Sequence, residues 1–365
     1  MKRFFALALA LTMLAALAGC GAAPVPAETT APAAPAETAA PAETAAPATE
    51  APAAAETQAS AAGTILVGNG EKPLPQKFDN FIALGNTQLD HLVALDVMPV
   101  AASMPRRPDD PDVPNSASYY NDGFGAMYPD EILKDVESLD MQLDASIERI
   151  IELDPDFIIA SQSDEKHLEK LEAIAPTYLI PNDTAGEDGM RDWKEVHRMM
   201  GKLVGKAEKA EENIASYEAL VKSYQDQIGD SVKGKTALIY QISSTGKGLW
   251  MSSKESASQI YTDFGFVLPE HFTLTGDYYA VEELITLNPD YMFVQVGSVE
   301  EYEKLANNPI WQSLTAVKEG HVYEYSHYVW TQTNGYLSST KKLTDVGEFI
   351  LHGTQNCTTF SQEGK

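Results

Sequence analysis

The sequence predicts an α/β protein made of two similar lobes that are joined by one long helix. An internal repeat indicates the two lobes, because Ser146–Ser161 (SIERIIELDPDFIIAS) aligns without a gap on Ala280–Gln295 (AVEELITLNPDYMFVQ). Apolar runs of strand length alternate with helical patterns around each copy, which is typical of a mostly parallel sheet flanked by helices. Between the halves, Asp192–Ile228 carries two helical patterns and no strand.

Each copy of the repeat reads as a helix, a turn and a buried strand. In the first copy, four apolar residues recur at helical spacing and predict a short amphipathic helix with one buried face, namely Ile147, Ile150, Ile151 and Leu153. Pro155 or Pro289 then ends the helix, because proline disfavours the helical region for the residue before it. A continuous apolar run follows, as expected of a strand buried on both faces of a parallel sheet. The copies are 134 positions apart (280 − 146), too far for a solenoid repeat.

The first 62 residues are expected to export and tether the protein. Lys2 and Arg3 precede the apolar run Phe4–Leu17, which is too short for a membrane span, and Cys20 follows directly after Gly19. This order resembles the bacterial lipobox, which implies a signal peptide at 1–19 and a lipid anchor on Cys20; an ordinary secreted protein with an incidental cysteine is the alternative. Residues 20–62 are then an extended Ala/Pro/Glu/Thr tether with nothing to fill a core.

The remaining chain divides into an N-terminal lobe at 63–190, a helical region with the joining helix at 191–230, a C-terminal lobe at 231–353 and a polar tail at 354–365. Within the helical region, two patterns at 192–204 and 206–228 are broken at Gly205. The tail contains Cys357, the only cysteine besides Cys20, so the sequence supports no disulfide. In the lobes the expected strands are Phe81–Leu84, Met98–Ala102, Phe157–Ala160, Tyr178–Ile180, Thr236–Ile242, Leu249–Ser252, Tyr291–Val294 and Val322–Tyr325.

Charge and motifs exclude several classes of function. The formal net charge is −27, and −29 once Lys2 and Arg3 are removed, so nucleic acid is not expected as a partner. No catalytic signature of a hydrolase, metalloprotease or nucleotide-binding loop is present. The seven histidines show neither helical metal-ligand spacing nor a tight cluster, so we expect no metal site, no cofactor and no enzyme activity.

Several motifs occur in the order of a known family. FDNFIALGNTQLDHLVALDVMPV, SIERIIELDPDFIIAS, KLEAIAP, a long helix, KTALIYQ, AVEELITLNPDYMFV and NPIWQSLTAVKEGHVYEY cover essentially all of residues 75–352. This order resembles the class III substrate-binding proteins of ABC importers, which carry iron–siderophore complexes, haem or cobalamin. The resemblance implies two Rossmann-like lobes, one connecting helix and a ligand cleft between the lobes, consistent with ligand binding at the carboxyl ends of parallel strands.

The resemblance also implies roles for single residues. Glu148 and Glu282 match the paired lobe-tip glutamates that meet arginines of the permease; the alternative is that each is a solvated acid on a helix. Trp330 matches an aromatic residue that packs on the ligand; the alternative is a core tryptophan. Gln142 stands where hydroxamate-binding relatives carry an arginine, which leaves the ligand's identity open. Further aromatic residues follow strands or lie in loops expected to face the cleft, and each is open to a core or surface role instead: Tyr119, Tyr120, Tyr240, Trp250, Tyr278 and Tyr279.

Two neighbouring arginines are candidates for binding an anionic ligand. The mature chain has only five arginines, and Arg106 and Arg107 lie together in a Pro- and Tyr-rich loop. In so acidic a chain, an anionic complex needs local cations, and guanidinium groups stay charged and offer planar donors. The alternative is that both arginines pair with the acids that follow at 109, 110 and 112.

The function expected is that of a lipid-anchored, monomeric surface receptor that binds a ferric siderophore and delivers it to an ABC permease and its ATPase. Within the same family, a haem- or cobalamin-binding receptor is the alternative, with His327 or Tyr336 as an axial ligand of haem. A tethered surface enzyme would need a nucleophile–base pairing, which the sequence does not show. An adhesive surface protein is disfavoured because two lobes joined by a helix suit a cleft.

Overall fold

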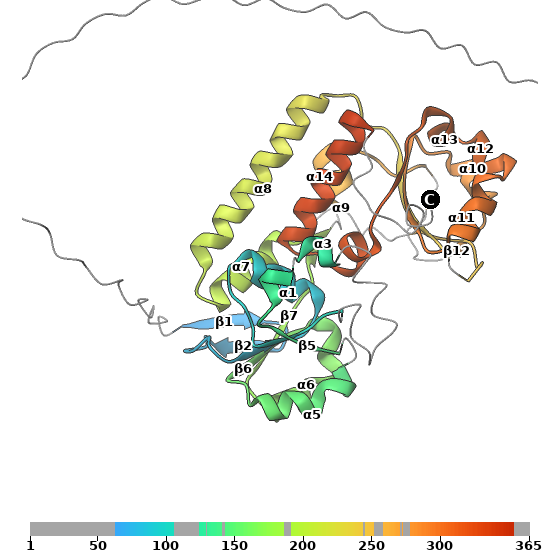
Figure 1. Cartoon of the computed structure of the whole chain (residues 1–365). Coiled ribbons are helices and arrows are strands. Elements are labelled where there is room, and N and C mark those ends of the chain that lie inside the picture. The colour runs from blue at the N-terminus through green and yellow to red at the C-terminus, as the bar shows by residue number, and fades with distance from the viewer. Residues whose placement is uncertain are drawn as a thin grey trace, which may run out of the picture. The chain divides into compact units, whose positions relative to one another are not determined.

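The computed structural model describes residues 63–105, 124–128, 130–140, 143–185, 191–243, 245–251, 258–270, 272 and 278–353 (Figure 1). The signal peptide, Cys20, the tether and the polar tail predicted from the sequence lie outside these residues. All the described residues belong to one compact unit, so contacts between its two lobes are part of the described structure.

The first lobe contains a wholly parallel sheet of five strands in the order β5-β4-β3-β6-β7. This is the doubly wound arrangement, in which the chain starts in the middle of the sheet and builds outward to each side. Every residue of β3, β4, β6 and β7 is buried, as their apolar runs predicted. The strands are β3 (Phe81–Ala83), β4 (Ala101–Ser103), β5 (Glu137–Leu139), β6 (Phe157–Ser161) and β7 (Thr177–Ile180).

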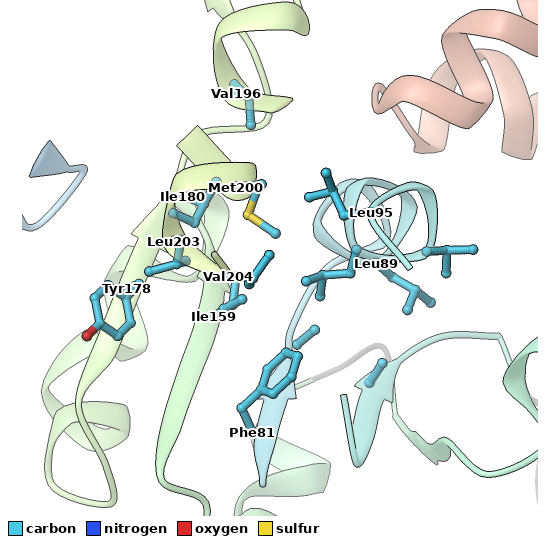
Figure 2. Packing of buried hydrophobic residues seen from close by; sticks show 14 of the residues in the cluster. Phe81, Leu89, Leu95, Ile159, Tyr178, Ile180, Val196, Met200, Leu203 and Val204 are labelled. Atoms are coloured by element: carbon cyan, nitrogen blue, oxygen red, sulfur yellow. The ribbon is translucent and has the colours of Figure 1, made fainter. Parts of the chain in front are cut away.

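Helices cover both faces of this sheet because alternate strand residues point to opposite sides. Phe81 and Ile159 pack with residues of α1 (Asn86–Ala94) and α7 (Lys194–Leu203) in one cluster (Figure 2). Ile158 belongs to a second cluster, on the face covered by α5 (Leu143–Leu153) and α6 (Leu168–Glu172).

The second lobe contains a mixed sheet in the order β12-β11-β10-β13-β14. It is parallel only across β10, β13 and β14, whereas β11 pairs antiparallel with both β10 and β12. Only residues 243–248 link β10 to β11, too few for a parallel crossover, and Gly246 and Gly248 take positive φ values of 69° and 110° in that turn. The strands are β10 (Ala237–Ile242), β11 (Leu249–Met251), β12 (Tyr278–Tyr279), β13 (Tyr291–Val296) and β14 (Val322–Glu324).

The repeated unit adopts the same local structure in both lobes. Helices α5 and α10 (Glu283–Leu287) each lead through a proline into the strands β6 and β13. Before those prolines, Asp154 and Asn288 have positive φ values of 44° and 28°, so both helices end in a left-handed turn. One prediction was wrong: Ile151 is not on the buried face, because Ile150 takes the inward position and Ile151 points to solvent.

Helix α8 (Ala207–Ile228) joins the two lobes, and its ends are marked by Gly205 and Gly229, both with positive φ. Ala210 belongs to the core of the first lobe, whereas Ile214 and Tyr224 belong to the core of the second. The closing helix α14 (Tyr336–His352) runs beside α8 (Figure 1). The ring of Tyr224 fills the space where a larger residue at 347 would place its Cβ, which explains the glycine there.

The remaining helices and strands lie outside the two five-stranded sheets. The sequence did not predict the antiparallel hairpin of β1 and β2, which attaches to the first sheet where Gly68 N donates to Leu179 O at 2.7 Å. These elements are β1 (Thr64–Val67), β2 (Gly70–Pro73), α3 (Gly125–Met127), α4 (Asp130–Leu133), the 3₁₀ helix η2 (Gln162–His167), β8 (Thr184–Ala185), β9 (Arg191–Asp192), α9 (Ser258–Phe264), α11 (Val299–Ala306), α12 (Pro309–Ser313), α13 (Thr315–Glu319) and the π-helical turn η3 (Tyr328–Gln332).

Candidate functional site

A polar cavity of about 310 Å³ opens at the carboxyl ends of the first sheet. Its walls come from residues that end or follow β3, β4, β6 and β7, from the first residue of α5, and from η3 of the second lobe. In doubly wound sheets, ligands bind at this edge, beside the point where the strand order reverses. The lining residues are Leu84, Gly85, Asn86, Thr87, Gln88, Ser103, Leu143, Ser161, Ser163, Asp164, Asn182, Thr331 and Gln332.

The amino terminus of α1 forms one wall of the cavity, and Gly85 makes this possible. Gly85 precedes the helix with φ 103° and ψ 139°, a conformation that L side chains rarely adopt. A Cβ at this position would also overlap Gln88 Oε1 and approach Ser161 Cβ to 3.1 Å. Since the first N–H groups of a helix have no partner within it, this wall favours oxygen acceptors and negative charge.

A hydrogen-bond network holds the wall between β6 and β7. Ser161 Oγ donates to Asn182 Oδ1 at 3.0 Å and lies 2.6 Å from Ser163 Oγ. Gln88 Nε2 donates to Asn182 Oδ1 at 3.2 Å and to Ile180 O at 3.3 Å. The other amide atom, Gln88 Oε1, is buried and has no hydrogen-bond partner among the described residues. Such a preorganised network presents hydroxyl and amide groups to a ligand without reordering them.

The opposite wall, Thr331 and Gln332, is fixed by His327. Its Nδ1 lies 2.7 Å from Thr331 Oγ1 and 2.9 Å from Gln241 Nε2, and its Nε2 lies 2.9 Å from Gln332 Nε2. Burial lowers the pKa of His327 to about 4, so the imidazole is neutral at pH 7. Because both ring nitrogens are engaged, His327 acts here as a positioning residue; an axial bond to haem would require these contacts to break.

The same wall is tied to the first lobe through α1. Asp90, fully buried, accepts hydrogen bonds from Leu337 N at 2.7 Å and Ser338 N at 2.8 Å, so it caps the amino terminus of α14. Nearby, Asn334 N donates to Thr87 Oγ1 at 3.1 Å. Burial raises the pKa of Asp90 to about 6 despite these two N–H donors. The lobes therefore meet through α1 and α14 as well as through α8.

The described cavity wall carries no cationic side chain. Its one charged residue is Asp164, whose pKa is raised by burial. Lys342 does not line the cavity. Its buried ammonium donates to Thr333 O at 3.0 Å, and burial lowers its pKa to about 8. An anionic ligand would therefore meet helix N–H groups and hydroxyls, but also the Asp164 carboxyl group, in the described part of the cavity.

Several residues predicted to contact a ligand lie outside the described residues: Arg106, Arg107, Tyr119, Tyr120 and Gln142. Their roles stay predictions. Leu143, the first described residue after Gln142, lines the cavity.

Tyr240 and Trp330 are core residues in this structure. Tyr240 is fully buried among apolar side chains, and its hydroxyl lies 3.4 Å from Met292 Sδ. Trp330 is fully buried in the second lobe, where it stacks on Tyr325 and donates from Nε1 to Asp345 Oδ2 at 3.3 Å. Neither ring lines the cavity, and contact with a ligand would require the surrounding core to move.

The other aromatic candidates lie in two separate places, and none lines the cavity. Trp250 and Tyr278 meet edge to face at 5.0 Å on the antiparallel side of the second sheet, and Tyr279 is adjacent to Tyr278 in β12. Tyr336 begins α14 and stacks on His197 at 5.4 Å, at the contact between α14 and α7. Their ligand contacts stay predictions.

Glu148 is exposed on α5, Glu282 is exposed at the residue before α10, and neither lines the cavity. Neither carboxylate has an ion-pair or hydrogen-bond partner among the described residues. Both are therefore available to a partner molecule.

The sequence-based predictions did not include the cavity residues, because those predictions concerned mainly aromatic and cationic side chains. A signal for them existed: Gly85, Ser161 and Asn182 each follow a strand that was predicted as buried and parallel. Polar residues at the carboxyl ends of such strands gather at one edge of the sheet.

The fold and the cavity define a ligand-binding protein of two α/β lobes. A family model for periplasmic binding proteins matches residues 82–329, and the chain belongs to this family. The relatives are binding proteins and not enzymes, so the prediction of a substrate-binding protein without enzyme activity is confirmed.

Individual relatives show how far the similarity extends. The "Iron-uptake system-binding protein" of Bacillus subtilis is 32% identical over 219 residues, which cover 58% of this chain and 67% of the relative. The "Probable siderophore-binding lipoprotein YfiY" of the same organism is 26% identical over 297 residues, covering 76% and 84%. Among solved structures, FeuA of B. subtilis with ferri-bacillibactin has 25% identity and a TM-score of 0.61 over 79% of this chain and 98% of FeuA. PiuA of Streptococcus pneumoniae, with a TM-score of 0.64 over 80% and 99% but only 19% identity, supports the fold alone.

Among the described residues, no helix is long and apolar enough to span a bilayer. In the same residues, no group of three or more His, Cys, Asp or Glu side chains is placed to hold a metal ion.

Proposed function

We propose that this protein is an extracytoplasmic, lipid-anchored receptor that binds a ferric siderophore and delivers it to an ABC permease. The observation that carries the proposal is the cavity at the carboxyl ends of the first sheet, walled by Ser161 and Asn182 on one side and by Thr331 of the second lobe on the other. The relatives named for iron uptake, siderophore binding and ferri-bacillibactin support this ligand class.

The chemistry of the cavity suits a chelated metal complex. In a ferric siderophore the iron is already held by the siderophore's own oxygens, so the protein needs hydrogen-bonding groups and not metal ligands. Ser161, Ser163, Asn182 and Thr331 supply hydroxyl and amide groups, and the amino terminus of α1 supplies N–H donors for ligand oxygens.

An anionic complex also needs positive charge, which we assign to Arg106 and Arg107. Replacing both with alanine should weaken binding of an anionic ferric catecholate by about 2–4 kcal/mol, in line with a lost partner for a partly buried charge. A neutral ferric hydroxamate should lose far less. Unchanged affinity for the preferred anionic ligand, with the circular dichroism spectrum intact, would show that the arginines serve only the acids beside them.

Delivery needs an anchor and a docking surface. We assign the anchor to a lipid on Cys20, so Cys20→Ala should move the protein from the membrane fraction to the medium. We assign docking to Glu148 and Glu282, whose carboxylates are exposed and unpaired among the described residues. Their exchange for alanine should leave the ligand dissociation constant unchanged while uptake by cells falls.

The experiment that tests the ligand class is a tryptophan fluorescence titration with ferric catecholate, ferric hydroxamate and ferric citrate complexes, each compared with its iron-free form. Trp250 and Trp330 are the expected reporters. Saturable one-to-one quenching by one ferric class supports the proposal. A Soret band on adding haemin, without response to any siderophore, would replace it with a haem receptor.

A further inference from the structure

Each copy of the internal repeat exposes one isoleucine to solvent. Ile151 on α5 is 55% exposed and Ile285 on α10 is 53% exposed. The two residues occupy the same position of the repeat, 134 residues apart (285 − 151). A single exposed aliphatic residue is ordinary on a protein surface. Here the same residue type is exposed to the same extent at matching points of both lobes.

The other exposed positions of the repeated helices have diverged. Both copies expose five matching positions in the helix and the turn that ends it. Three of these pairs differ in residue type: Arg149 with Glu283, Glu152 with Thr286 and Asp154 with Asn288. Only the pairs Glu148–Glu282 and Ile151–Ile285 are identical.

Packing within the chain does not require the two isoleucines. The inward position of each helix is filled by Ile150 in the first lobe and Leu284 in the second, both fully buried. Ile151 and Ile285 therefore stay outside the core that these residues complete.

The identical residues form one patch on each helix. Glu148 and Ile151 are three residues apart, as are Glu282 and Ile285, and side chains at this spacing lie on the same face of a helix. Glu282 directly precedes α10, but its φ of −61° and ψ of −30° are helical, so the rule holds for both pairs. Arg149 is held by Glu137 and Glu152 at 2.6 and 2.8 Å, so it does not neutralise Glu148 in the described structure. Each patch thus combines an unpaired carboxylate with an exposed aliphatic side chain.

We propose that Ile151 and Ile285 are the apolar anchors of two equivalent docking patches, whose occupant is the permease of the importer. Because the same acid–isoleucine pair occurs on both lobes, the permease would need two matching binding sites. Each of them would contain a cationic side chain beside an apolar recess. A second copy of this chain is a poor occupant, because its net charge of −27 and unpaired carboxylates would repel an identical patch. This inference rests on the proposed function and adds the apolar half of the contact.

The test is a binding assay on the full chain, with the importer's permease–ATPase complex in nanodiscs as the probe. Ile151→Ala and Ile285→Ala should each weaken binding by about tenfold, and together by about a hundredfold, as expected for burying most of an isoleucine side chain. Exposed aliphatic residues outside the repeat are matched controls: Leu66→Ala in the first lobe and Val267→Ala in the second, at 71% and 43% exposure, should change nothing. Ligand affinity should stay constant in all five variants, the double variant included.

The outcomes separate this inference from the proposed function. If the unmodified chain binds neither a ferric siderophore nor the permease complex, the proposed function is wrong. If it binds both, and the isoleucine variants bind the permease complex as tightly as the controls do, the inference is overturned while the function stands. A shift from dimer to monomer in the double variant on analytical ultracentrifugation would overturn it in favour of a second copy.

Discussion

Exchanging Gly85 for alanine tests whether the close approach of α1 to β6 builds the ligand site. The backbone there has φ 103°, and the added Cβ would overlap Gln88 Oε1 and press on Ser161. Positive φ costs a non-glycine residue about 1–3 kcal/mol, and overpacking costs about 1–3 kcal/mol more. The variant should therefore lose about 2–6 kcal/mol of unfolding free energy.

Gly70→Ala is a matched control, because Gly70 has nearly the same φ, 102°, with nothing within 4 Å of the added Cβ. Gly70→Ala should lose only the unfolding free energy that the positive φ costs, about 1–3 kcal/mol. Urea unfolding gives the stability of both variants, and calorimetric titration gives their affinity for the ferric siderophore. Gly85→Ala should bind at least about tenfold more weakly, because two cavity residues move, whereas Gly70→Ala should bind normally.

A double variant makes this reasoning refutable even if Gly85→Ala is barely stable. Adding Gln88→Ala removes the atom that the new Cβ would overlap, so the two substitutions together should cost less than the sum of the single costs. Strict additivity, or equal losses of stability and unchanged ligand affinity in Gly85→Ala and Gly70→Ala, would refute the claim that this contact shapes the site.

Two further predictions concern pH. The pKa of His327 is about 4 in the folded protein and near 6.5 in the unfolded chain. Its contribution to stability is therefore present above pH 6.5, and up to about 3 kcal/mol of it is lost as the pH falls toward 4. His327→Gln should flatten this part of the pH profile measured by urea unfolding. Asp90 has the opposite sign, because its pKa of about 6 in the folded protein lies above the 3.8 of an unperturbed aspartate. The wild-type protein should therefore lose up to about 3 kcal/mol of unfolding free energy relative to Asp90→Asn as the pH rises from 4 to 6. Parallel profiles of the two proteins would contradict this.

Much of the fold could be predicted because burial leaves a regular pattern in sequence. The repeat gave the helix–turn–strand unit of both lobes, and the break at Gly205 separated α7 from α8. The antiparallel direction of β11 could also have been predicted, since the link from β10 is too short for a parallel crossover. The hairpin of β1 and β2 was missed because four-residue strands carry little periodic signal.

The site was harder to predict because its geometry depends on segments far apart in the chain. Thr331 and Gln332 line the same cavity as Ser161, and they precede α14, whose amino terminus is capped by Asp90 of the first lobe across more than 240 residues of chain. The aromatic residues chosen from the sequence, Tyr240 and Trp330, fill cores instead, because large rings are as suited to packing as to ligand binding.

The central claim, that a ferric siderophore occupies this cavity, is tested most directly by calorimetric titration of a variant with a blocked cavity. Ser163 is exposed and lines the cavity, so Ser163→Trp fills the site at little cost to the fold; Ser216→Trp, on the exposed face of α8, is the control. We predict that the wild-type protein and Ser216→Trp bind one equivalent of the same ferric siderophore with equal affinity, and that Ser163→Trp binds at least a hundredfold more weakly, on the order of 3 kcal/mol. Equal binding by all three proteins would contradict the account.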